Sequence, residues 1–507
     1  MTNVLLITTD QQRADSLGCY GNPLGATPRL DALAAEGTRF SHARTQHVLC
    51  QPARASILTG TYPSTHGVTG NGTDLGADNG DRSLATLLHA AGHQTALFGK
   101  AHFATTFPFY PTGQVESVEG SARVAPDWTG PYFGFDHAEM ILFGHNLRIA
   151  DLMGQWSWAF GPPPFGLHYA QYLFRDGPEK GYERLRLMQP EAAGAQWDHT
   201  QTWRNALPEE DHPTTWVADR AVEWLGNVNA PFFAWVSFTD PHHPQDPPAP
   251  WCDKYSAADA LEVVPEIHEG ELENKPPLHA FFSNGMRGRP MEWANPGGGT
   301  YTREELATMN ASYYGMVAQL DHAIGRVLDT LAERGLADDT IVIMTADHGE
   351  FMGEHQLIFK GPFGYDSLLR VPLIVRGPGF EAGAVVDEPV GTMDIAPTAL
   401  DALGHEVPKW MEGRPLRDGP REHHLAENDF DIITWMPMRT LTTRRYKLHR
   451  YLEQPWGELY DLQEDPGELV NRYDDPEYAS VRDDMLSLCN EVMNHDVRRD
   501  PKVGLVA

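Results

Sequence analysis

Short apolar runs alternate with amphipathic segments over the first four hundred residues of this 507-residue chain. The apolar runs have the length and composition of buried strands, and they lie at 4–8, 94–98, 232–238 and 340–345. The segments between them have helical periodicity with proline or glycine at their ends, and they lie at 28–36, 83–91, 218–225 and 303–334. This alternation predicts an α/β fold in which helices flank a mostly parallel sheet.

Two stretches interrupt the alternation. Residues 104–211 are rich in aromatic residues, proline and glycine, residues 244–299 are rich in proline and glycine, and we interpret both as insertions. After a last helix-like segment at 394–403, short strand-like pieces appear at 446–451 and 459–462. We therefore expect a large α/β domain at 1–404 and a smaller C-terminal α+β subdomain at 405–507.

The charge of the chain restricts its partners. There are 39 Lys and Arg residues against 70 Asp and Glu residues, for a net charge of −31 at pH 7. This charge repels nucleic acids and anionic lipids, so we expect neither nucleic acid nor a membrane as a partner. The sequence contains no run long enough to span a bilayer and no signal-peptide pattern, which predicts a cytoplasmic protein. To bind an anion, such a protein must gather positive charge at one place.

Polar residues follow each predicted strand directly. They are Asp10 and Gln11, Lys100 and His102, His242 and His243, and Asp347 and His348. Because the carboxyl ends of parallel strands meet at one edge of the sheet, we expect these side chains to lie close together. Two acids with several imidazoles have the composition of a metal site.

Cys50 differs from the other three cysteines in its neighbours. No pair of the four has CxxC spacing, so a disulfide framework or a structural zinc site is not expected, and Cys19, Cys252 and Cys489 are interpreted as structural. Cys50 precedes a predicted helix in which Pro52 lies in the first turn and which Gly60 ends. A helix N-terminus and Arg54 both favour an anionic oxygen or a thiolate at this position.

The segment Cys50-x-Pro52-x-Arg54, followed by four residues and Thr59-Gly60, resembles the signature of the type I sulfatases. In that family the cysteine is oxidised after synthesis to formylglycine. Further motifs extend the resemblance over most of the chain: Asp10-Gln11, Gly99-Lys100-x-His102, Pro241-His242-x-Pro244, Asp347-His348-Gly349, Lys360, Arg370-Val371-Pro372, Glu458-Leu459-Tyr460-Asp461-Leu462 and Asp465-Pro466. The resemblance implies an alkaline-phosphatase-like fold, a superfamily that includes phosphonate monoester hydrolases and phosphodiesterases.

The resemblance also implies hydrolysis of small-molecule sulfate esters by a formylglycine diol made from Cys50, and hence a maturation enzyme as a partner. The metal ligands would be Asp10, Gln11, Asp347, His348 and an oxygen of the modified Cys50. These ligands are mostly oxygen atoms, which fits Ca²⁺ best and Mn²⁺ as an alternative.

The remaining roles concern the substrate and proton transfer. Arg54 would hold the diol, and Lys100 and Lys360 would bind the sulfate oxygens. His102 would act as the base that deprotonates the intermediate, and His242, which the family pattern favours over His243, would protonate the leaving oxygen. Asn71 is a substrate-binding candidate, although its Gly-Asn-Gly setting is also that of a turn residue.

Two departures from the family pattern leave alternatives open. Many sulfatases carry a second Asp where this chain has Gln11, and Gln11 resembles the phosphonate monoester hydrolases and choline sulfatases; Ala53 replaces the usual serine. The same residues would therefore suit a hydrolase of phosphonate monoesters or phosphodiesters. A non-catalytic anion- or metal-binding protein of the same fold is a third interpretation, and a homo-oligomer is compatible with the sequence.

Overall fold

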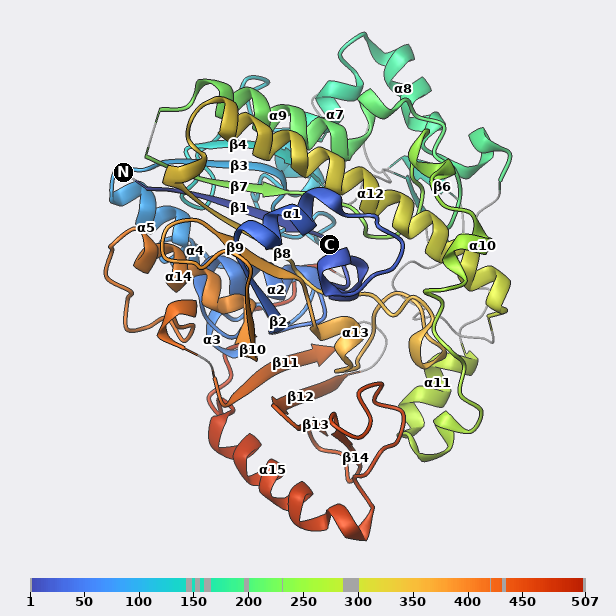
Figure 1. Ribbon diagram of the computed structural model, residues 1–507. Helices are drawn as coiled ribbons and strands as arrows, with labels where there is room; N and C mark the ends of the chain where they lie inside the picture. Colours follow the sequence, from blue (N-terminus) through green and yellow to red (C-terminus); the bar gives the residue numbers. More distant parts are fainter. Residues whose placement is uncertain are drawn as a thin grey trace.

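The computed structural model describes residues 2–142, 148–150, 156–158, 166–195, 200–229, 231–285, 301–419, 421–430 and 435–504. Its centre is a sheet of eight strands in the order β10-β2-β9-β8-β1-β7-β3-β4 (Figure 1). The strands are β1 (Asn3–Thr9), β2 (Thr38–Arg44), β3 (Gln94–Lys100), β4 (His137–Ile141), β7 (Phe232–Ser237), β8 (Thr340–Ala346), β9 (Leu373–Arg376) and β10 (Ala384–Gly391). This arrangement confirms the predicted α/β class.

Strand β1 lies in the middle of the sheet and pairs in parallel with β7 and β8, so that Val4 faces Phe233 on one side and Ile341 on the other. Strand β3 continues the parallel arrangement beyond β7. Only β9 runs antiparallel to its neighbours β2 and β8. All seven residues of β1 and all seven of β8 are buried, as expected for strands covered on both faces.

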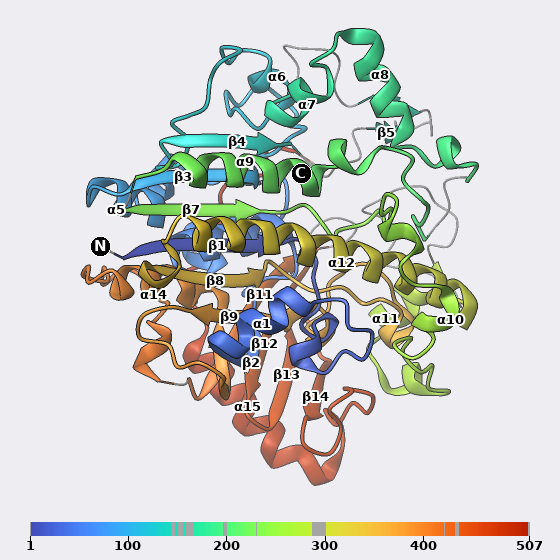
Figure 2. The same ribbon diagram turned by 45° about the horizontal axis from the view of Figure 1, so that its top comes forward.

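Helices cover both faces of this sheet (Figure 2). On one face lie α1 (Pro28–Glu36), α9 (Pro213–Asn227) and α12 (Arg303–Glu333), which pack against one another; on the other lie α2 (Cys50–Thr59), α5 (Leu84–Ala90) and α14 (Ile395–Ala402). Shorter helices are α3 (Pro63–His66), α4 (Ala77–Gly80), α6 (Val118–Ser121), α7 (His168–Leu173), α8 (Pro178–Leu187), α10 (Ala257–Ala260), α11 (Pro277–Gly285) and α13 (Asp366–Leu369). The main hydrophobic core lies between the sheet and these two layers.

A second sheet follows in the sequence, with four antiparallel strands in the order β11-β12-β13-β14. They are β11 (His423–Phe430), β12 (Met436–Thr443), β13 (Tyr446–Tyr451) and β14 (Gly457–Asp461), and α15 (Ala479–Val492) packs on β12 and β13. The chain then returns to the connection between α3 and α4, where the amide of Val503 donates to the carbonyl of Gly72 at 2.8 Å. The change of pattern after Gly404 thus predicts the small sheet, while the domain boundary itself stays a prediction.

Part of the region 104–211 joins the large sheet, while its interpretation as an insertion stays a prediction. Strand β4 pairs in parallel with β3, so that Ala96 faces His137. Its sequence alternates half-buried and buried residues at the edge of the sheet, a weak pattern within an aromatic-rich stretch. Residues 148–150 and 156–158 form a separate two-stranded ribbon, β5 and β6. In the described part of the chain, no helix is both long enough and apolar enough to cross a membrane.

Gly99 shows why one motif glycine is needed for the fold. It lies in β3 beside Ser237 of β7 with φ of +96°, and a Cβ atom at this position would lie 1.9 Å from the carbonyl oxygen of Ser237. Any side chain at this position would therefore push β3 and β7 apart next to Lys100, the last residue of β3. Gly92 has a similar φ of +91°, but its Cβ would meet nothing within 4 Å.

We predict that Gly99→Ala destabilises the protein more than Gly92→Ala. Both substitutions place a side chain at positive φ, but only the first also overlaps a neighbouring strand, which typically adds about 1–3 kcal/mol. Urea denaturation of the two variants measures the difference. Equal urea midpoints for the two variants would show that the overlap with β7 does not lower the free energy of unfolding.

Candidate active site

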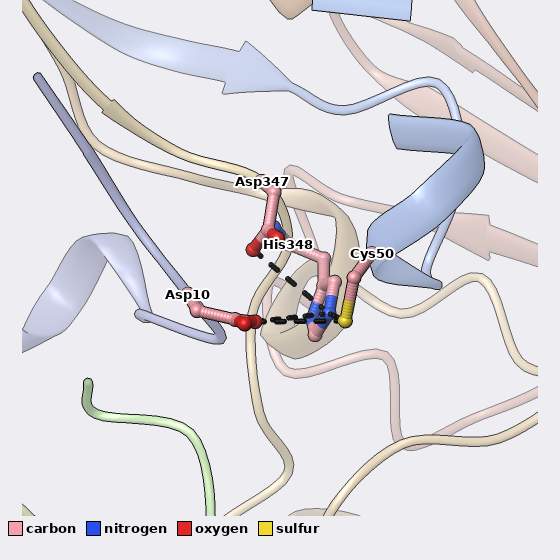
Figure 3. A group of neighbouring side chains, drawn as sticks. All are labelled: Asp10, Cys50, Asp347 and His348. Carbon is pink, nitrogen blue, oxygen red and sulfur yellow. Dashed lines mark hydrogen bonds and ion pairs between the residues drawn. The ribbon is translucent and has the colours of Figure 1, made fainter. Parts of the chain in front are cut away.

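The polar residues that follow the central strands meet at one edge of the large sheet. Asp10 follows β1 directly, Asp347 and His348 follow β8, and Lys100 is the last residue of β3. The parallel pairing of β1 with β8 brings Asp10 and Asp347 together, because Thr9 faces Ala346 at the last register position. Cys50 is the first residue of α2, and its side chain points toward Asp10, Asp347 and His348 (Figure 3).

Asp10, Cys50, Asp347 and His348 each point one possible ligand atom at a common centre, and these atoms lie within 4.8 Å of one another. All four residues are buried. A hydrogen bond orients the ring of His348 as a metal ligand, because Nδ1 donates to the carbonyl of Gly349 at 2.9 Å. Nε2 then carries the lone pair and faces the centre.

Gln11 adds a carboxamide to this group. The backbone N–H of Gln11 donates to Asp347 Oδ1 at 3.0 Å, which orients that carboxylate. The backbone of Gln11 has φ of +62°. Its side-chain oxygen faces Lys360 Nζ at 2.8 Å. Two carboxylates, one imidazole nitrogen and one carboxamide oxygen therefore converge here, and this donor set fits a divalent cation.

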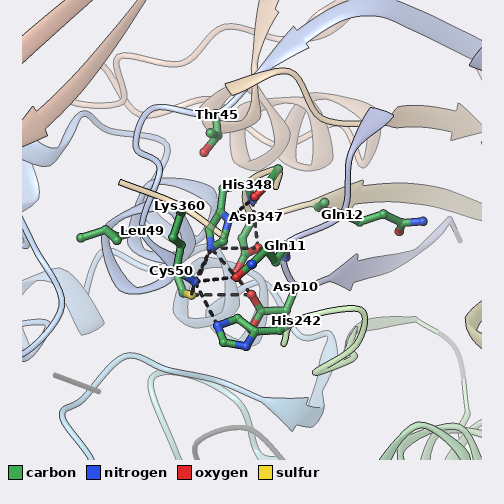
Figure 4. A network of polar contacts seen from close by, with 12 residues as sticks. Asp10, Gln11, Gln12, Thr45, Leu49, Cys50, His242, Asp347, His348 and Lys360 are labelled. Carbon is green, nitrogen blue, oxygen red and sulfur yellow. Dashed lines mark hydrogen bonds and ion pairs between the residues drawn. The ribbon is translucent and has the colours of Figure 1, made fainter. Parts of the chain in front are cut away.

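Cys50 contacts three groups through its sulfur atom (Figure 4). Sγ lies 3.1 Å from His348 Nε2, 3.3 Å from Lys360 Nζ and 3.6 Å from Asp10 Oδ1. Burial and the Asp10 carboxylate oppose ionisation of the thiol, but the nearby cations outweigh them and lower the pKa of Cys50. The site thus favours negative charge on whatever atom replaces or carries this sulfur.

Arg54 and Lys100 compensate the two buried carboxylates. Arg54 lies one turn after Cys50 on α2, and its Nε donates to Asp347 Oδ2 at 2.8 Å. Lys100 Nζ lies 2.5 Å from Asp10 Oδ2. Burial alone would raise the pKa of Asp10, but Lys100 and the other cations hold it well below its usual value. Asp10 is therefore ionised at neutral pH, and each of the two carboxylates is paired with a cation.

Lys360 and His242 are the half-buried members of the site, which places them on its open side. Lys360 Nζ lies 3.0 Å from His242 Nε2 and 3.3 Å from His348 Nε2 (Figure 4). His242 Nδ1 donates to the carbonyl of His243 at 2.6 Å, so its Nε2 faces the site. Burial and the charge of Lys360 both lower the pKa of His242 well below its usual value.

His102 is buried, and neither ring nitrogen has a hydrogen-bond partner among the described residues. Burial and the charges of Lys100 and Arg54 hold the pKa of His102 well below its usual value, so the ring is neutral at pH 7. His102 also has φ of +58°, a backbone conformation that a side chain adopts only when its surroundings enforce it.

Glu116 enforces this conformation, and the sequence analysis does not identify it. Its carboxylate accepts the backbone N–H groups of His102 at 2.6 Å, Phe103 at 2.9 Å and Ala104 at 3.1 Å, and the hydroxyl of Tyr132. Burial raises the pKa of Glu116 to about 7 despite these donors. A lone acid in an aromatic-rich stretch gives no sequence signal for this role.

Asn71 lies next to the first turn of α2, which begins at Cys50, rather than among the strand ends. Its side-chain oxygen accepts the backbone N–H of Gln51 at 3.1 Å, so it holds the first turn of α2. The Gln51 side chain in turn donates to the carbonyl of Thr73 at 2.6 Å and accepts from the amide of Gly72 at 2.8 Å. Its substrate-binding role stays a prediction.

Comparison with known proteins gives a consistent result. Residues 2–405 match the family model described as Sulfatase, and residues 353–495 match the model described as N-sulphoglucosamine sulphohydrolase, C-terminal. The chain is 29% identical to an arylsulfatase of Clostridium perfringens, over 94% of this chain and 91% of the relative. It is 30% identical to a multifunctional alkaline phosphatase superfamily protein of Trinickia caryophylli, over 95% of this chain and 93% of that protein.

A solved structure supports the fold assignment. The phosphonate monoester hydrolase of Agrobacterium radiobacter superimposes with a TM-score of 0.73 at 28% identity, covering 97% of this chain and 96% of that one. The predicted alkaline-phosphatase-like architecture is therefore confirmed.

We predict that Asp347→Ala weakens binding of Ca²⁺ or Mn²⁺ by more than roughly 100-fold. Loss of a residue that only hydrogen-bonds to a metal ligand typically costs about 10- to 100-fold, and Asp347 is itself a proposed ligand. The carboxylate is buried at the common centre, whereas Asp338 lies exposed at the start of β8. Asp338→Ala is the matched control and should bind like the unmodified protein. Elemental analysis and calorimetric titration measure both variants, and a full equivalent of metal in folded Asp347→Ala would refute the site.

Proposed function

Because this chain belongs to the sulfatase family, we propose that it hydrolyses sulfate monoesters with a formylglycine derived from Cys50 and one divalent cation, Ca²⁺ or Mn²⁺. Hydrolysis of sulfuric esters follows from the family and its named relatives. The nucleophile and the cation are the proposal. The observation that carries it is the position of Cys50, at the first turn of a helix and in contact with His348 and Lys360.

The formylglycine and the cation would each supply defined chemistry. In a hydrated formylglycine, one hydroxyl oxygen would attack sulfur and displace the alcohol, and loss of the proton from the second hydroxyl would then restore the aldehyde and expel the sulfate bonded to the first oxygen. A divalent cation would lower the pKa of such a nucleophile. Asp10, Gln11, Asp347 and His348 would hold the cation. The chain's own side chains then have to bind the ester, position the oxygen atoms and move two protons.

Substrate binding falls to the cations on the open side. Lys360 is half-buried and its Nζ lies 3.3 Å from Cys50 Sγ, so it can contact both the nucleophile and a sulfate oxygen. Lys100 lies deeper, against Asp10, and completes the positive surroundings. Arg54 is wholly buried, and its Nη2 lies 3.9 Å from Asp10 Oδ2 but has no hydrogen-bond partner among the described residues, which leaves its two N–H groups for the modified Cys50.

His242 is the proposed acid for the leaving oxygen. In the free protein its Nε2 is unprotonated, because Lys360 and burial disfavour a second charge. A bound sulfate ester brings a negative charge between Lys360 and His242, and that charge favours the imidazolium form. His242 therefore becomes a competent acid only with substrate present.

His102 is the proposed base in the second step. A base must be unprotonated at working pH, and the neighbouring cations keep this imidazole neutral. The position of His102 depends on Glu116, whose carboxylate accepts the backbone N–H groups of residues 102, 103 and 104.

Hydrolysis of phosphonate monoesters or phosphodiesters is the second candidate function. Two observations favour it: the similarity to the phosphonate monoester hydrolase structure and the carboxamide of Gln11 in place of a second acid. Both reactions would use the same residues. The comparison of kcat/KM for an aryl sulfate and an aryl phosphonate distinguishes them, and a preference for the phosphonate would replace the sulfatase assignment.

We predict that the Cys50 peptide carries an aldehyde or its hydrate when the protein comes from a host with a maturation enzyme. Cys50→Ala should abolish turnover of an aryl sulfate without unfolding the protein, since only a side chain at a helix end is lost. Cys252→Ala, at a partly exposed cysteine outside the site, is the control and should retain full activity. An unmodified thiol in active protein, shown by mass spectrometry, would contradict the proposal.

We predict that Glu116→Ala lowers kcat for an aryl sulfate by up to about 100-fold, because His102 loses the contacts that hold its loop. Three buried N–H groups lose their acceptor, and the free energy of unfolding should fall by roughly 1–3 kcal/mol or more. Glu119→Ala, three residues away and partly exposed, should change neither quantity. Unchanged turnover in Glu116→Ala would show that the loop is held by other contacts.

A further inference from the structure

The side chain of Gln11 has only one favourable orientation in this site. Its oxygen accepts from the Lys360 ammonium group at 2.8 Å. Its nitrogen donates to the carboxylate of Glu350 and lies 3.1 Å from His243 Nδ1, a second acceptor. Turning the carboxamide over would place its oxygen against a carboxylate and its NH₂ group against an ammonium. The Lys360 ammonium on one side and the Glu350 carboxylate on the other therefore determine that the oxygen of the Gln11 carboxamide faces the cation position.

Glu350 is the acceptor that creates this difference. It is fully buried, two residues after His348, and it is an acid that no motif discussed above includes. One carboxylate oxygen accepts the amide N–H of Met352 at 3.1 Å and that of Phe359, and the other accepts from Gln11. All of the hydrogen bonds to this carboxyl group among the described residues come from N–H donors, so both of its oxygens act as acceptors.

The same carboxylate also fixes Lys360. Phe359 has φ of +63°, a strained conformation for an aromatic residue, and its N–H is held by Glu350. Lys360 follows directly and extends over Cys50. Glu350 thus links two chain segments, the turn after β1 and the loop that carries the lysine.

We propose that Glu350 is a positioning residue that presents the carboxamide oxygen of Gln11, rather than its nitrogen, to the divalent cation. This inference rests on the proposed cation site. It also explains the carboxamide at position 11: a carboxylate there would have no N–H group to donate to Glu350 and would place two acceptors against each other in a buried site. The acid is at position 350, so the neutral partner is at position 11.

An exchange of the two side chains tests the proposal. The variants are Glu350→Gln, Gln11→Glu and the double variant Gln11→Glu/Glu350→Gln, which keeps one acid and one amide at the same two positions. Calorimetric titration with Ca²⁺ alone, on protein first freed of metal by a chelator, measures affinity. Thermal denaturation in the chelator measures the interaction of the two side chains without any cation.

We expect Glu350→Gln to weaken Ca²⁺ binding by roughly 10-fold or more, because a carboxamide at position 350 no longer forces the orientation of the Gln11 side chain. Gln11→Glu should lower the melting temperature in chelator, since two buried carboxylates then share one space. The double variant should recover the melting temperature and most of the Ca²⁺ affinity, because the amide at 350 can donate to the acid at 11. Glu354→Gln, an acid of the same loop that pairs with Arg13, is the control and should bind Ca²⁺ normally.

Three results would overturn the proposal, and they are distinguishable. Unchanged Ca²⁺ affinity in folded Glu350→Gln would remove the positioning role and leave the proposed function intact. A double variant as impaired as the sum of the single variants would show that the two side chains do not act on each other. Failure of the unmodified protein to bind either Ca²⁺ or Mn²⁺ would overturn the cation in the proposed function and this inference with it.

Discussion

The burial of two carboxylates, each paired with a cation, at the end of a parallel sheet is the constraint on which the structure depends. Asp10 and Asp347 are fully buried, and an unpaired charge there would be too costly to keep. Lys100 compensates one and Arg54 the other, at 2.5 and 2.8 Å. These cations come from β3 and α2, so four separate elements must be assembled before the charges balance. Removing one partner of such a pair typically costs about 3–5 kcal/mol.

The same requirement gives an acidic protein a binding site for anions. The net charge of −31 is spread over the whole chain, whereas the cations Arg54, Lys100 and Lys360 are concentrated around Cys50. Two of these cations are committed to carboxylates, and Lys360 alone lies half-buried beside His242. An anionic ester approaching from that side meets the lysine first. Local arrangement of charge, and not the total, therefore decides what this site attracts.

Much of this arrangement was predictable because parallel strands have a fixed geometry. Apolar periodicity identifies β1 and β8, and the convergence of their carboxyl ends places Asp10 beside Asp347 without further information. The unpredicted parts depend on contacts between side chains and distant backbone amides. Glu116 and Glu350 each accept N–H groups from loops, and no spacing or residue pattern marks such an acid in advance. Strand β4 was missed for a related reason, since an edge strand needs only a weak alternation.

Charge alone cannot select between a sulfate ester and a phosphonate ester in this site. A sulfate monoester and a phosphonate monoester each carry one negative charge, so Lys100 and Lys360 attract both equally. The two differ in shape and in hydrogen-bonding capacity, because the phosphonate keeps one carbon substituent where the sulfate has a third terminal oxygen. A group that donates or accepts at that position distinguishes them. Of the proposed catalytic residues, His102 has both ring nitrogens without a partner among the described residues, and its loop is fixed by Glu116. A hydrogen bond between one of these nitrogens and the third terminal oxygen is therefore the contact that would favour a sulfate, because a carbon substituent in its place would leave the buried ring without that partner.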